Sequence, residues 1–391
     1  MGMAATMVPD AADRPGVLPT DRLLGNGMAM PALRVDLRRI DNTRNALSVV
    51  AVWFWVAVII GGAVWIDRWW SYLIAFVLMG PMYARFAILM HEAAHKLLFT
   101  NKRWNDFIGK WVVAYPVFTP VQLYRRVHFA HHKDEFGPDE PDMAFYAPYP
   151  CTRRSLRRRL VRDAVGISGW KNFVPLVKNT LHKPFRPIGL SIFAVQAVLW
   201  AVMWAATGRW WIYPVLWWLP WMTEWRVLNR LRSIAEHGGM ERSPDRRATT
   251  HNVRQSLLAR FFIVPYNTGW HLAHHVDMGV PWRNLPAYHE ELERYRAAVA
   301  AEGTGRKLQS LVDALRKKGL DVHGSEVLKT APKGYPRDHA RVELLRFKGL
   351  VVMKSWEPAA WLGTAGAKKR VVDVFQSAKP LLAWLETNVG A

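Results

Sequence analysis

Residues 46–66 read ALSVVAVWFWVAVIIGGAVWI and contain no charged side chain. A helix needs about 20 apolar residues to cross the hydrocarbon core of a bilayer, and this run has that length. Three further apolar segments follow, and the last of them is shorter and rich in Trp. We therefore predict an all-α integral membrane protein with four transmembrane helices, at about residues 46–66, 71–90, 188–207 and 210–226.

Charge follows the topology that these helices imply. The chain carries a formal net charge of +22, and seventeen Lys or Arg residues lie between Lys96 and Arg186, whereas the loops at 67–68 and 208–209 carry one each. This is the positive-inside pattern, so both termini and the segment between the two helix pairs are expected in the cytosol. Membrane lipids with anionic headgroups, rather than nucleic acid, are the expected partners of the arginine runs at 153–154 and 157–159.

Tryptophan marks the other side of the membrane. Amphipathic aromatic rings gather where hydrocarbon meets headgroups. Of the 21 Trp residues, six lie at the ends of the two predicted helix pairs: Trp65, Trp69, Trp70, Trp204, Trp210 and Trp211. The single cysteine, Cys151, excludes an internal disulfide and fits a reducing compartment. A bacterial inner membrane is the expected location.

Eight of the fourteen histidines fall in three clusters, and a ninth, His237, stands alone. The clusters are His91-Glu-Ala-Ala-His95, His128-Phe-Ala-His131-His132 and His271-Leu-Ala-His274-His275. Residues three or four apart share a helix face, so the first histidine of each cluster is expected to align with the others. Nine imidazoles exceed what one zinc ion needs, and imidazole is a good ligand for iron. The pattern predicts a site for two metal ions at the membrane face.

These residues resemble the membrane-bound fatty acid desaturases over about residues 45–290. The resemblance rests on the three boxes, on their order and on their positions after the second and fourth apolar segments. Arg232-Ser-Ile-Ala-Glu236-His237-Gly is similar to the segment that supplies a further ligand in that family. Asn267-Thr-Gly-Trp-His271 opens a similar third box, and Glu140-Pro-Asp142 follows the second.

The resemblance implies a cytosolic helical cap that holds a non-haem di-iron centre. Two iron ions (Fe2+/Fe3+) would use O2 as co-substrate to introduce a C=C double bond into a fatty acyl substrate carried as acyl-lipid, acyl-CoA or acyl-carrier. Electrons would come from a separate donor, a ferredoxin or a cytochrome b5-like protein with its reductase. The implied ligands, whose division between the ions stays open, are His91, His95, His128, His131, His132, His237, His271, His274 and His275.

Other polar residues near the boxes are candidates for orienting these ligands. Metal-bound histidines usually donate their second ring N–H to a carboxylate or a carbonyl. The candidates next to the boxes are Glu92, Asp134, Glu236, Asn267 and Asp277. A plain surface role is expected for the histidines outside the boxes, which are His182, His251, His289, His323 and His339.

Three alternative functions remain open. Lipid or carotenoid hydroxylases and ketolases share such boxes, because a carbon radical that gains oxygen becomes an alcohol instead of an alkene. His91-Glu92-Ala-Ala-His95 also matches the zinc-protease pattern, in which Glu92 would be the general base. In a zinc protease, most histidines of the other two boxes would have no role as ligands. A non-enzymatic membrane protein that holds metal would tolerate the loss of any single box.

The two ends of the chain differ from the membrane domain at 46–290. Residues 1–45 are predicted to form a cytosolic tail, whose first part is rich in Pro, Gly, Ala and Met and is expected to be mobile. Residues 291–391 are predicted to form a small soluble α/β region, with helical periodicity at 308–315, a strand at Gly349–Met353 and an amphipathic helix at Val371–Trp384. Around Gly334 and Gly349 this region resembles the carboxy-terminal half of a soluble bacterial family of unknown function, which implies no chemistry.

Overall fold

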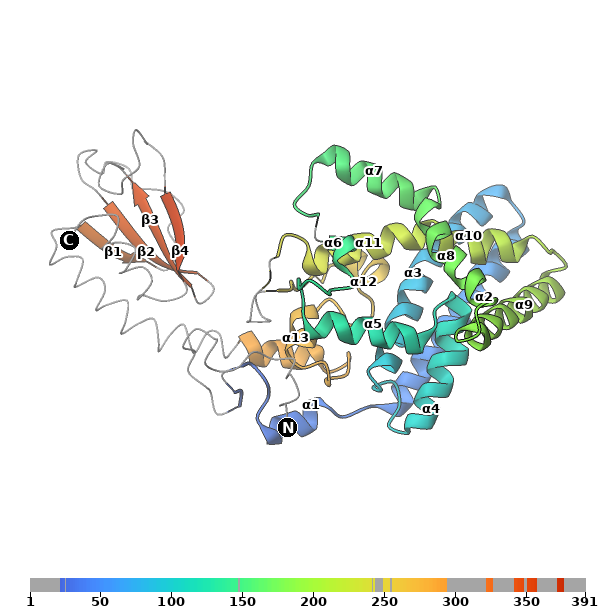
Figure 1. Cartoon of the computed structure of the whole chain (residues 1–391), viewed down its shortest axis with the longest axis horizontal. Coiled ribbons are helices and arrows are strands. Elements are labelled where there is room, and N and C mark those ends of the chain that lie inside the picture. Colours follow the sequence, from blue (N-terminus) through green and yellow to red (C-terminus); the bar gives the residue numbers. More distant parts are fainter. Residues whose placement is uncertain are drawn as a thin grey trace. The chain divides into compact units, whose positions relative to one another are not determined.

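The computed structural model describes residues 22–293, apart from 25, 147, 241, 243–248 and 254, and the backbone of four later strands. The described chain is mostly helical (Figure 1). It divides into one compact unit of Met1–Pro9 with Pro31–His289, and a second of Asp10–Met30 with Glu290–Ala391. The residues before 22 and the predicted helix at 308–315 lie outside the described residues.

The first unit contains the helices and all of the described histidine clusters. Its elements are α1 (Pro31–Leu37), α2 (Asn42–Ile66), α3 (Trp69–Ala94), α4 (Lys102–Phe107), the π-helical turn η2 (Ile108–Ala114), the 3-10 turn η3 (Tyr115–Val117), α5 (Val121–Lys133), α6 (Met143–Tyr146), α7 (Arg153–Ala164), α8 (Ile167–Asn179), α9 (Arg186–Thr207), the π-helical turn η4 (Pro214–Trp218), α10 (Leu219–Met222), α11 (Glu224–His237), α12 (Leu257–Phe262) and α13 (His271–Val276).

Three helical stretches are long and apolar enough to cross a membrane. They are Pro31–Ile66, which contains α2, then α3 and then α9. Each covers one of the first three predicted spans. Asp41 caps the start of α2, because its side chain accepts a hydrogen bond from the Arg44 backbone N–H, and the helix ends where Asp67 takes a left-handed conformation.

The fourth predicted span differs from the other three. Between Ile212 and Met222 the chain forms helical turns that include η4 and α10, and Thr223 interrupts the helix before α11 begins. Pro214 and Pro220 lie in this stretch, and each lacks the N–H that a regular helix would use. In the described chain this segment is therefore one short helix over 212–222 with a π-helical stretch inside it, and it is not among the three candidate spans.

A buried aromatic cluster joins the spans to this fourth segment. Trp217 is fully buried and stacks on Trp53 at a centroid distance of 5.7 Å, while the Trp53 ring meets Phe86 edge-on at 5.0 Å. Tyr83 lies on the other side of Trp217 and donates a hydrogen bond to its carbonyl. These contacts pack α2, α3 and η4 together through large rings that exclude water.

Three side chains donate hydrogen bonds to backbone carbonyl groups of the turns η2 and η3 inside this core. The Trp53 indole N–H donates to the Val112 carbonyl at 3.1 Å, and the Trp217 indole N–H donates to the Pro116 carbonyl at 3.1 Å. The Gln196 amide on α9 donates to the carbonyls of Tyr115 and Pro116. A buried carbonyl without a partner is costly, so these donors fix η2 and η3 against three helices.

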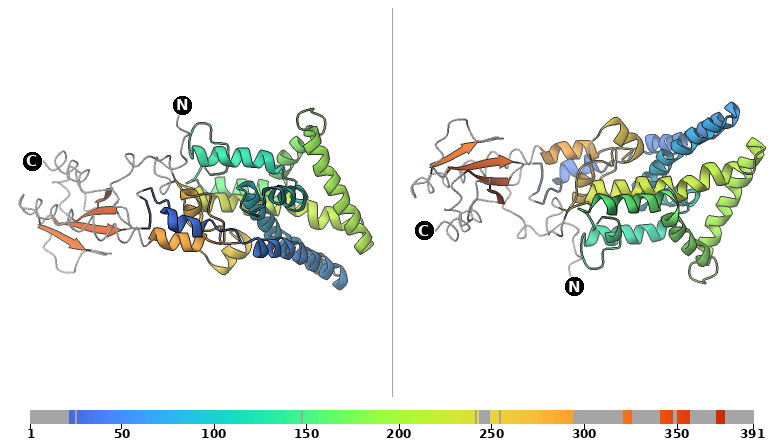
Figure 2. Two further views of the ribbon diagram at one scale, coloured as in Figure 1. Left: turned by 90° about the horizontal axis from the view of Figure 1, so that it is seen from below. Right: turned by 90° about the horizontal axis from the view of Figure 1, so that it is seen from above.

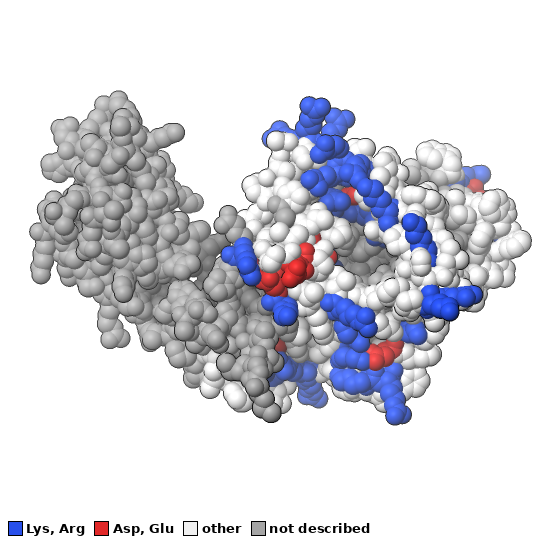
Figure 3. All heavy atoms as spheres, in the orientation of Figure 1, with Lys and Arg blue, Asp and Glu red and all other residues white. Residues whose placement is uncertain are grey.

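The two helix pairs extend to the same end of the unit, away from α13, in both views of Figure 2. At that end a paired ion bridge links the two loops, because Arg209 contacts both carboxylate oxygens of Asp67 at 2.5 and 2.7 Å. The third histidine box, on α13, therefore lies toward the opposite end of the unit. On that side, Lys and Arg side chains gather over α7 (Figure 3).

The second unit contains a four-stranded sheet in the order β1-β2-β3-β4. Its strands are β1 (Asp321–Ser325), β2 (Arg341–Phe347), β3 (Leu350–Trp356) and β4 (Val371–Phe375); β1 pairs parallel with β2, and the other pairs are antiparallel. The strand predicted at Gly349–Met353 is confirmed by β3. The helix predicted from Val371 is wrong over Val371–Phe375, because Val-Val-Asp-Val-Phe is β-branched at three positions and favours a strand.

Candidate metal centre

Each histidine cluster lies at a helix end, and in three of the four helices this is the carboxyl end. His91 and His95 close α3, His128–His132 close α5, His237 is the last residue of α11, and α13 carries the third box. The carboxyl end of a helix carries a partial negative charge and favours a cation. Four helices therefore bring the same kind of ligand to one region, and α3, α5 and α11 point their carboxyl ends at it.

The end of α3 is held by side chains from the segments that follow it. Asn105 is fully buried, donates to the Ala93 carbonyl at 2.9 Å and accepts from the Leu98 N–H at 3.0 Å. Arg125 on α5 donates to the carbonyls of Ala93 and Ala94. Because these groups cap the last turn of α3, they fix where its two histidines point.

The nine histidines form two sets. The first set has five members whose ring nitrogens all lie within 4.8 Å of one another. Their Nε2 atoms form a chain of short contacts, 3.1 Å for His91–His274, then 3.0 Å for His274–His132 and for His132–His128, and 2.9 Å for His128–His95. We call His91, His95, His128, His132 and His274 the five-histidine set.

The second set has four members, His131, His237, His271 and His275, and we call it the four-histidine set. The ring nitrogens of His131, His237 and His275 lie within 4.8 Å of one another. The Nε2 atom of His271 lies 3.0 Å from that of His237 and 3.0 Å from that of His275. His132 and His275, whose ring centroids are 4.3 Å apart, bring the two sets together.

The division corrects the expected alignment within each box. In α5, His128 and His132 belong to the five-histidine set and His131 to the other; in α13, His271 and His275 belong to the four-histidine set and His274 to the other. Neighbouring residues of a helix point about 100° apart. Consecutive histidines therefore cannot aim at one point, and each of these two boxes contributes to both sets.

Most Nδ1 atoms of the four-histidine set have a fixed acceptor. The Nδ1 of His275 lies 2.6 Å from a Glu135 oxygen, and that of His131 lies 2.9 Å from Glu140. His237 donates to the Thr249 carbonyl at 3.2 Å, and His271 lies at 3.6 Å from Glu236. An Nδ1 that carries the proton leaves a lone pair on Nε2.

The arrangement fits metal ions. Lone pairs that face each other at 3.0 Å repel unless a cation lies between them. For a metal–imidazole bond of about 2.1 Å, two nitrogens at a right angle lie about 3.0 Å apart. The short Nε2 contacts of both sets, 2.9 to 3.1 Å, match that separation.

Burial keeps most of these imidazoles neutral and ready to bind. Eight of the nine are buried, and His95 is half-buried. Burial lowers the pKa of His95 and of His237 to about 3 each, and it lowers the pKa of His271 and His275 as well. His131 is the exception, because the hydrogen bond to Glu140 outweighs burial and raises its pKa.

The five predicted orienting residues lie in different surroundings. Glu92 is buried with an oxygen 3.4 Å from the His91 Nδ1, and Glu236 lies beside His271. Asp134 pairs instead with Arg242 at 2.8 Å, and Asp277 pairs with Arg34 and Arg38. Asn267 takes a left-handed backbone conformation, and its carbonyl accepts from the Trp270 N–H.

Several residues that contact the histidines were not among the candidates. They are Glu135, Glu140, Tyr146, whose hydroxyl lies 3.2 Å from the His131 Nδ1, and Thr249. Glu135 is three residues past His132, so its spacing was a usable signal. Thr249 acts through its carbonyl, which no side-chain pattern reveals.

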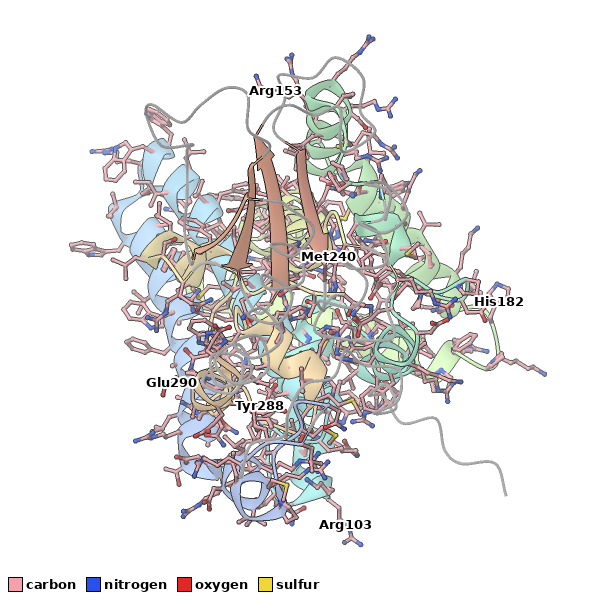
Figure 4. The ribbon with its side chains drawn as sticks, turned by 90° about the vertical axis from the view of Figure 1, so that its left-hand side faces the viewer. Arg103, Arg153, His182, Met240, Tyr288 and Glu290 are labelled. Atoms are coloured by element: carbon pink, nitrogen blue, oxygen red, sulfur yellow. The ribbon has the colours of Figure 1, made fainter. Side chains whose placement is uncertain are left out.

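The described histidines outside the boxes lie apart from the two sets. His182 is exposed at the edge of the unit and points away from it (Figure 4). His251 is half-buried and contacts the Gly238 carbonyl, and His289 stacks on Trp270 at 4.2 Å. His323 and His339 lie outside the residues whose side chains are described.

Nine histidines from four helix ends, next to three candidate membrane helices, define a membrane-associated histidine-box protein. Comparison with known proteins agrees. The family model described as fatty acid desaturase matches residues 67–302, and the chain belongs to that family. A second family model, described as conserved hypothetical protein (DUF2461), matches residues 282–384, as the resemblance of that region implied.

Curated relatives that the chain matches include desaturases, which are oxidoreductases. It is 24% identical over 237 residues to the dihydrorhizobitoxine desaturase of Bradyrhizobium elkanii, covering 55% of this chain and 65% of that protein. It is 23% identical to the chloroplastic omega-6 fatty acid desaturases of Arabidopsis thaliana and Glycine max, covering 58% of this chain and 54% and 57% of those proteins. The chain thus spans less than two thirds of the length of these relatives.

Proposed function

We propose that this protein is an O2-dependent fatty acid desaturase of the membrane with a histidine-ligated di-iron centre. The reaction removes two hydrogens from neighbouring carbons of an acyl chain, and O2 with two electrons and two protons becomes two waters. Iron held by the histidines would supply the oxidising power for this step. The observation that carries the proposal is the pair of histidine sets whose Nε2 lone pairs converge at 2.9 to 3.1 Å.

Each set would hold one iron ion, and together the nine histidines would be the ligands of the two ions. Glu135, Glu140 and the Thr249 carbonyl would keep the proton on Nδ1 of His275, His131 and His237, which leaves Nε2 to bind. Glu236 would do the same for His271, and Glu92 for His91. Asp134 and Asp277 have arginine partners and take structural roles.

The proposed topology has four spans and a cytosolic cap. The α2 and α3 helices form one pair, and α9 with the short helical segment of η4 and α10 forms the other. The histidines and most basic residues then lie on the cytosolic side, with both termini. We assign residues 1–45 to a tail, 46–290 to the desaturase domain and 291–391 to a soluble α/β region, in a bacterial inner membrane.

A zinc protease at His91-Glu92-Ala-Ala-His95 fits the geometry poorly. The two Glu92 oxygens contact His91 Nδ1 and the Trp282 N–H, so the carboxylate lies behind the ligand instead of facing a substrate. Three additional histidines also converge on the same point. A general base needs access to the water that it activates.

The test combines metal analysis with product analysis. The full chain is expressed in a bacterial host with an electron donor, its iron is counted after purification, and the host's fatty acids and small metabolites are profiled by mass spectrometry. New alkenes and two irons per chain support the proposal. His271→Gln and His132→Gln are expected to lose iron and product, and the exposed His182→Gln is the matched control.

The other outcomes are informative. New alcohols or ketones shift the assignment to a hydroxylase or ketolase of the same superfamily. A product outside the lipid fraction shifts the substrate class, which matters because one relative is named for dihydrorhizobitoxine. One zinc per chain and no oxidised product refute the proposal.

A further inference from the structure

The two histidine sets differ in the groups behind their rings. In the four-histidine set, three of four Nδ1 atoms face a carboxylate: His275 faces Glu135 at 2.6 Å, His131 faces Glu140 at 2.9 Å and His271 faces Glu236 at 3.6 Å. The fourth faces the Thr249 carbonyl. Every ring of this set therefore has an anionic or dipolar acceptor.

The five-histidine set has almost no such support. Among the described residues, only His91 has a carboxylate close to its Nδ1 atom, and that contact with Glu92 is long at 3.4 Å. The Glu135 carboxylate, which bonds His275, also lies within 4.8 Å of a His132 ring nitrogen. Among the described residues, no hydrogen bond reaches the Nδ1 of His95, His128 or His274, and the Nδ1 of His132 is buried without a partner. Three carboxylates thus lie next to Nδ1 atoms of the four-histidine set, and one lies next to an Nδ1 atom of the five-histidine set.

Among the carboxylates next to the four-histidine set, Glu140 shows most clearly how the two sets differ in charge. Its side chain is fully buried, and its oxygens accept from His131 and from the backbone N–H groups of Phe136 and Asp142. No described Lys or Arg lies at ion-pair distance from it, whereas Arg232 offsets the charge of Glu236 at 2.8 Å. The charge of Glu140 therefore acts on His131 and on whatever His131 binds.

A carboxylate behind an imidazole makes the ring a stronger electron donor. Added negative charge stabilises Fe3+ more than Fe2+, because the ferric ion carries one more positive charge, and net charge and hydrogen bonds to the ligands are what set such potentials. The carboxylates behind the four-histidine set would therefore favour oxidation of the ion held there.

We propose that the two ions are inequivalent, and that the ion in the four-histidine set is oxidised first, with Glu140 as the positioning residue that makes it so. This inference rests on the proposed di-iron function. It assigns to the Glu-Pro-Asp segment after the second box the task of setting the order in which the two ions give up electrons.

The first experiment identifies each ion by its spectrum. The full-length protein is loaded with 57Fe, reduced, and measured by Mössbauer spectroscopy, where two ferrous quadrupole doublets are expected. Glu140→Gln keeps the shape of the side chain and removes its charge, so it is expected to move one doublet only. Glu92→Gln is expected to move the other, and Asp139→Asn, an exposed neighbour of Glu140, neither.

The second experiment gives the order of oxidation. Ferricyanide takes one electron per molecule, so less than one equivalent per di-iron centre converts one Fe2+ of a centre to Fe3+. In the unsubstituted protein, the doublet lost first is expected to be the one that Glu140→Gln moves. In the Glu140→Gln protein, the preference for that doublet is expected to shrink or reverse.

Tyr146→Phe provides a second way to mark the same ion if Glu140→Gln does not fold. It removes the hydroxyl 3.2 Å from the His131 Nδ1 and keeps the ring. Loss of the Glu92-sensitive doublet first, parallel loss of both, or a shift of both doublets by Glu140→Gln overturns the inference while leaving a di-iron enzyme. Fewer than two irons in the unsubstituted protein overturns the proposed function itself.

Discussion

An ion pair between a partly exposed arginine and a buried carboxylate ties the segment before α2 to the third histidine box. Asp277 caps α13, and its side chain is only 2% exposed. Arg38 donates to both of its oxygens, at 2.6 Å through Nη2 and at 3.3 Å through Nε. Arg34 lies at 3.4 Å, and the Gly279 N–H donates at 2.9 Å.

Arg38→Met keeps the apolar stem of the side chain and removes these two hydrogen bonds. A hydrogen bond to a charged group contributes about 1.5–3 kcal/mol, and removing one partner leaves the other buried. Arg38 is 40% exposed and Arg34 remains, so solvent and the second arginine recover part of the loss. We expect a net destabilisation of about 2 kcal/mol, which is roughly 4–8 °C for a unit of this size.

The assay is thermal unfolding in detergent, followed by tryptophan fluorescence, with iron content measured in parallel. Arg39→Met is the matched control, because Arg39 is exposed and makes no side-chain bond among the described residues. The reasoning is refuted if Arg38→Met unfolds at the same temperature as Arg39→Met. It is also refuted if Asp277→Asn releases iron without lowering stability, since Asp277 would then act on the histidines directly.

Three further predictions concern the fold and the metal. Gln196→Leu leaves the Tyr213 hydroxyl without its acceptor and removes one of the two donors from the carbonyls of Tyr115 and Pro116, and is expected to cost about 1–3 kcal/mol in denaturant unfolding. Gly169→Ala puts a methyl group 2.1 Å from the Met222 carbonyl oxygen and is expected to destabilise by about 1–3 kcal/mol, whereas Gly61→Ala, with open space around it, is not expected to destabilise. Removing iron with a chelator is expected to lower the unfolding temperature reversibly, with recovery on adding Fe2+ and not Mg2+. An unchanged unfolding temperature would contradict the inference that metal ions bind between the converging lone pairs.

The features that the sequence predicts well are local ones. The spans containing α2, α3 and α9 follow from uninterrupted apolar runs, because length and composition alone decide whether a helix can cross a bilayer. The fourth segment has the same apolar character up to Met222, but it contains two prolines and a π-helical stretch and ends as a helix at Thr223. A run of apolar letters does not reveal where backbone hydrogen bonds are lost.

The grouping of the histidines was within reach of the sequence. The boxes show which rings gather, yet shared faces at three and four residues suggested one common direction for each box. The turn of about 100° per residue separates His131 from His132 and His274 from His275. Applied to the second and third boxes, that angle alone divides their histidines between two points.

Most of the residues that contact the histidine Nδ1 atoms could not be predicted from the sequence. His275 and Glu135 are 140 residues apart, and Arg38 and Asp277 are 239 apart, so only the fold brings them together. Asp277 stands two residues after a box and faces α1, while Glu135 stands three residues after a box and faces a ring of another box. Nearness in sequence does not separate these cases.

The interleaving of the boxes also constrains how the centre assembles. The α3 helix contributes to the five-histidine set alone and α11 to the four-histidine set alone, whereas α5 and α13 each contribute to both. A shift of α5 or α13 therefore moves ligands of both sets together, and a shift of α3 or α11 moves one. Arg125 holds the carbonyl end of α3 from α5, and Arg38 holds the end of α13 from the chain just before α2. The two shared helices are thus linked to α3 and to the segment just before α2, and we expect these contacts to set the spacing between the two sets.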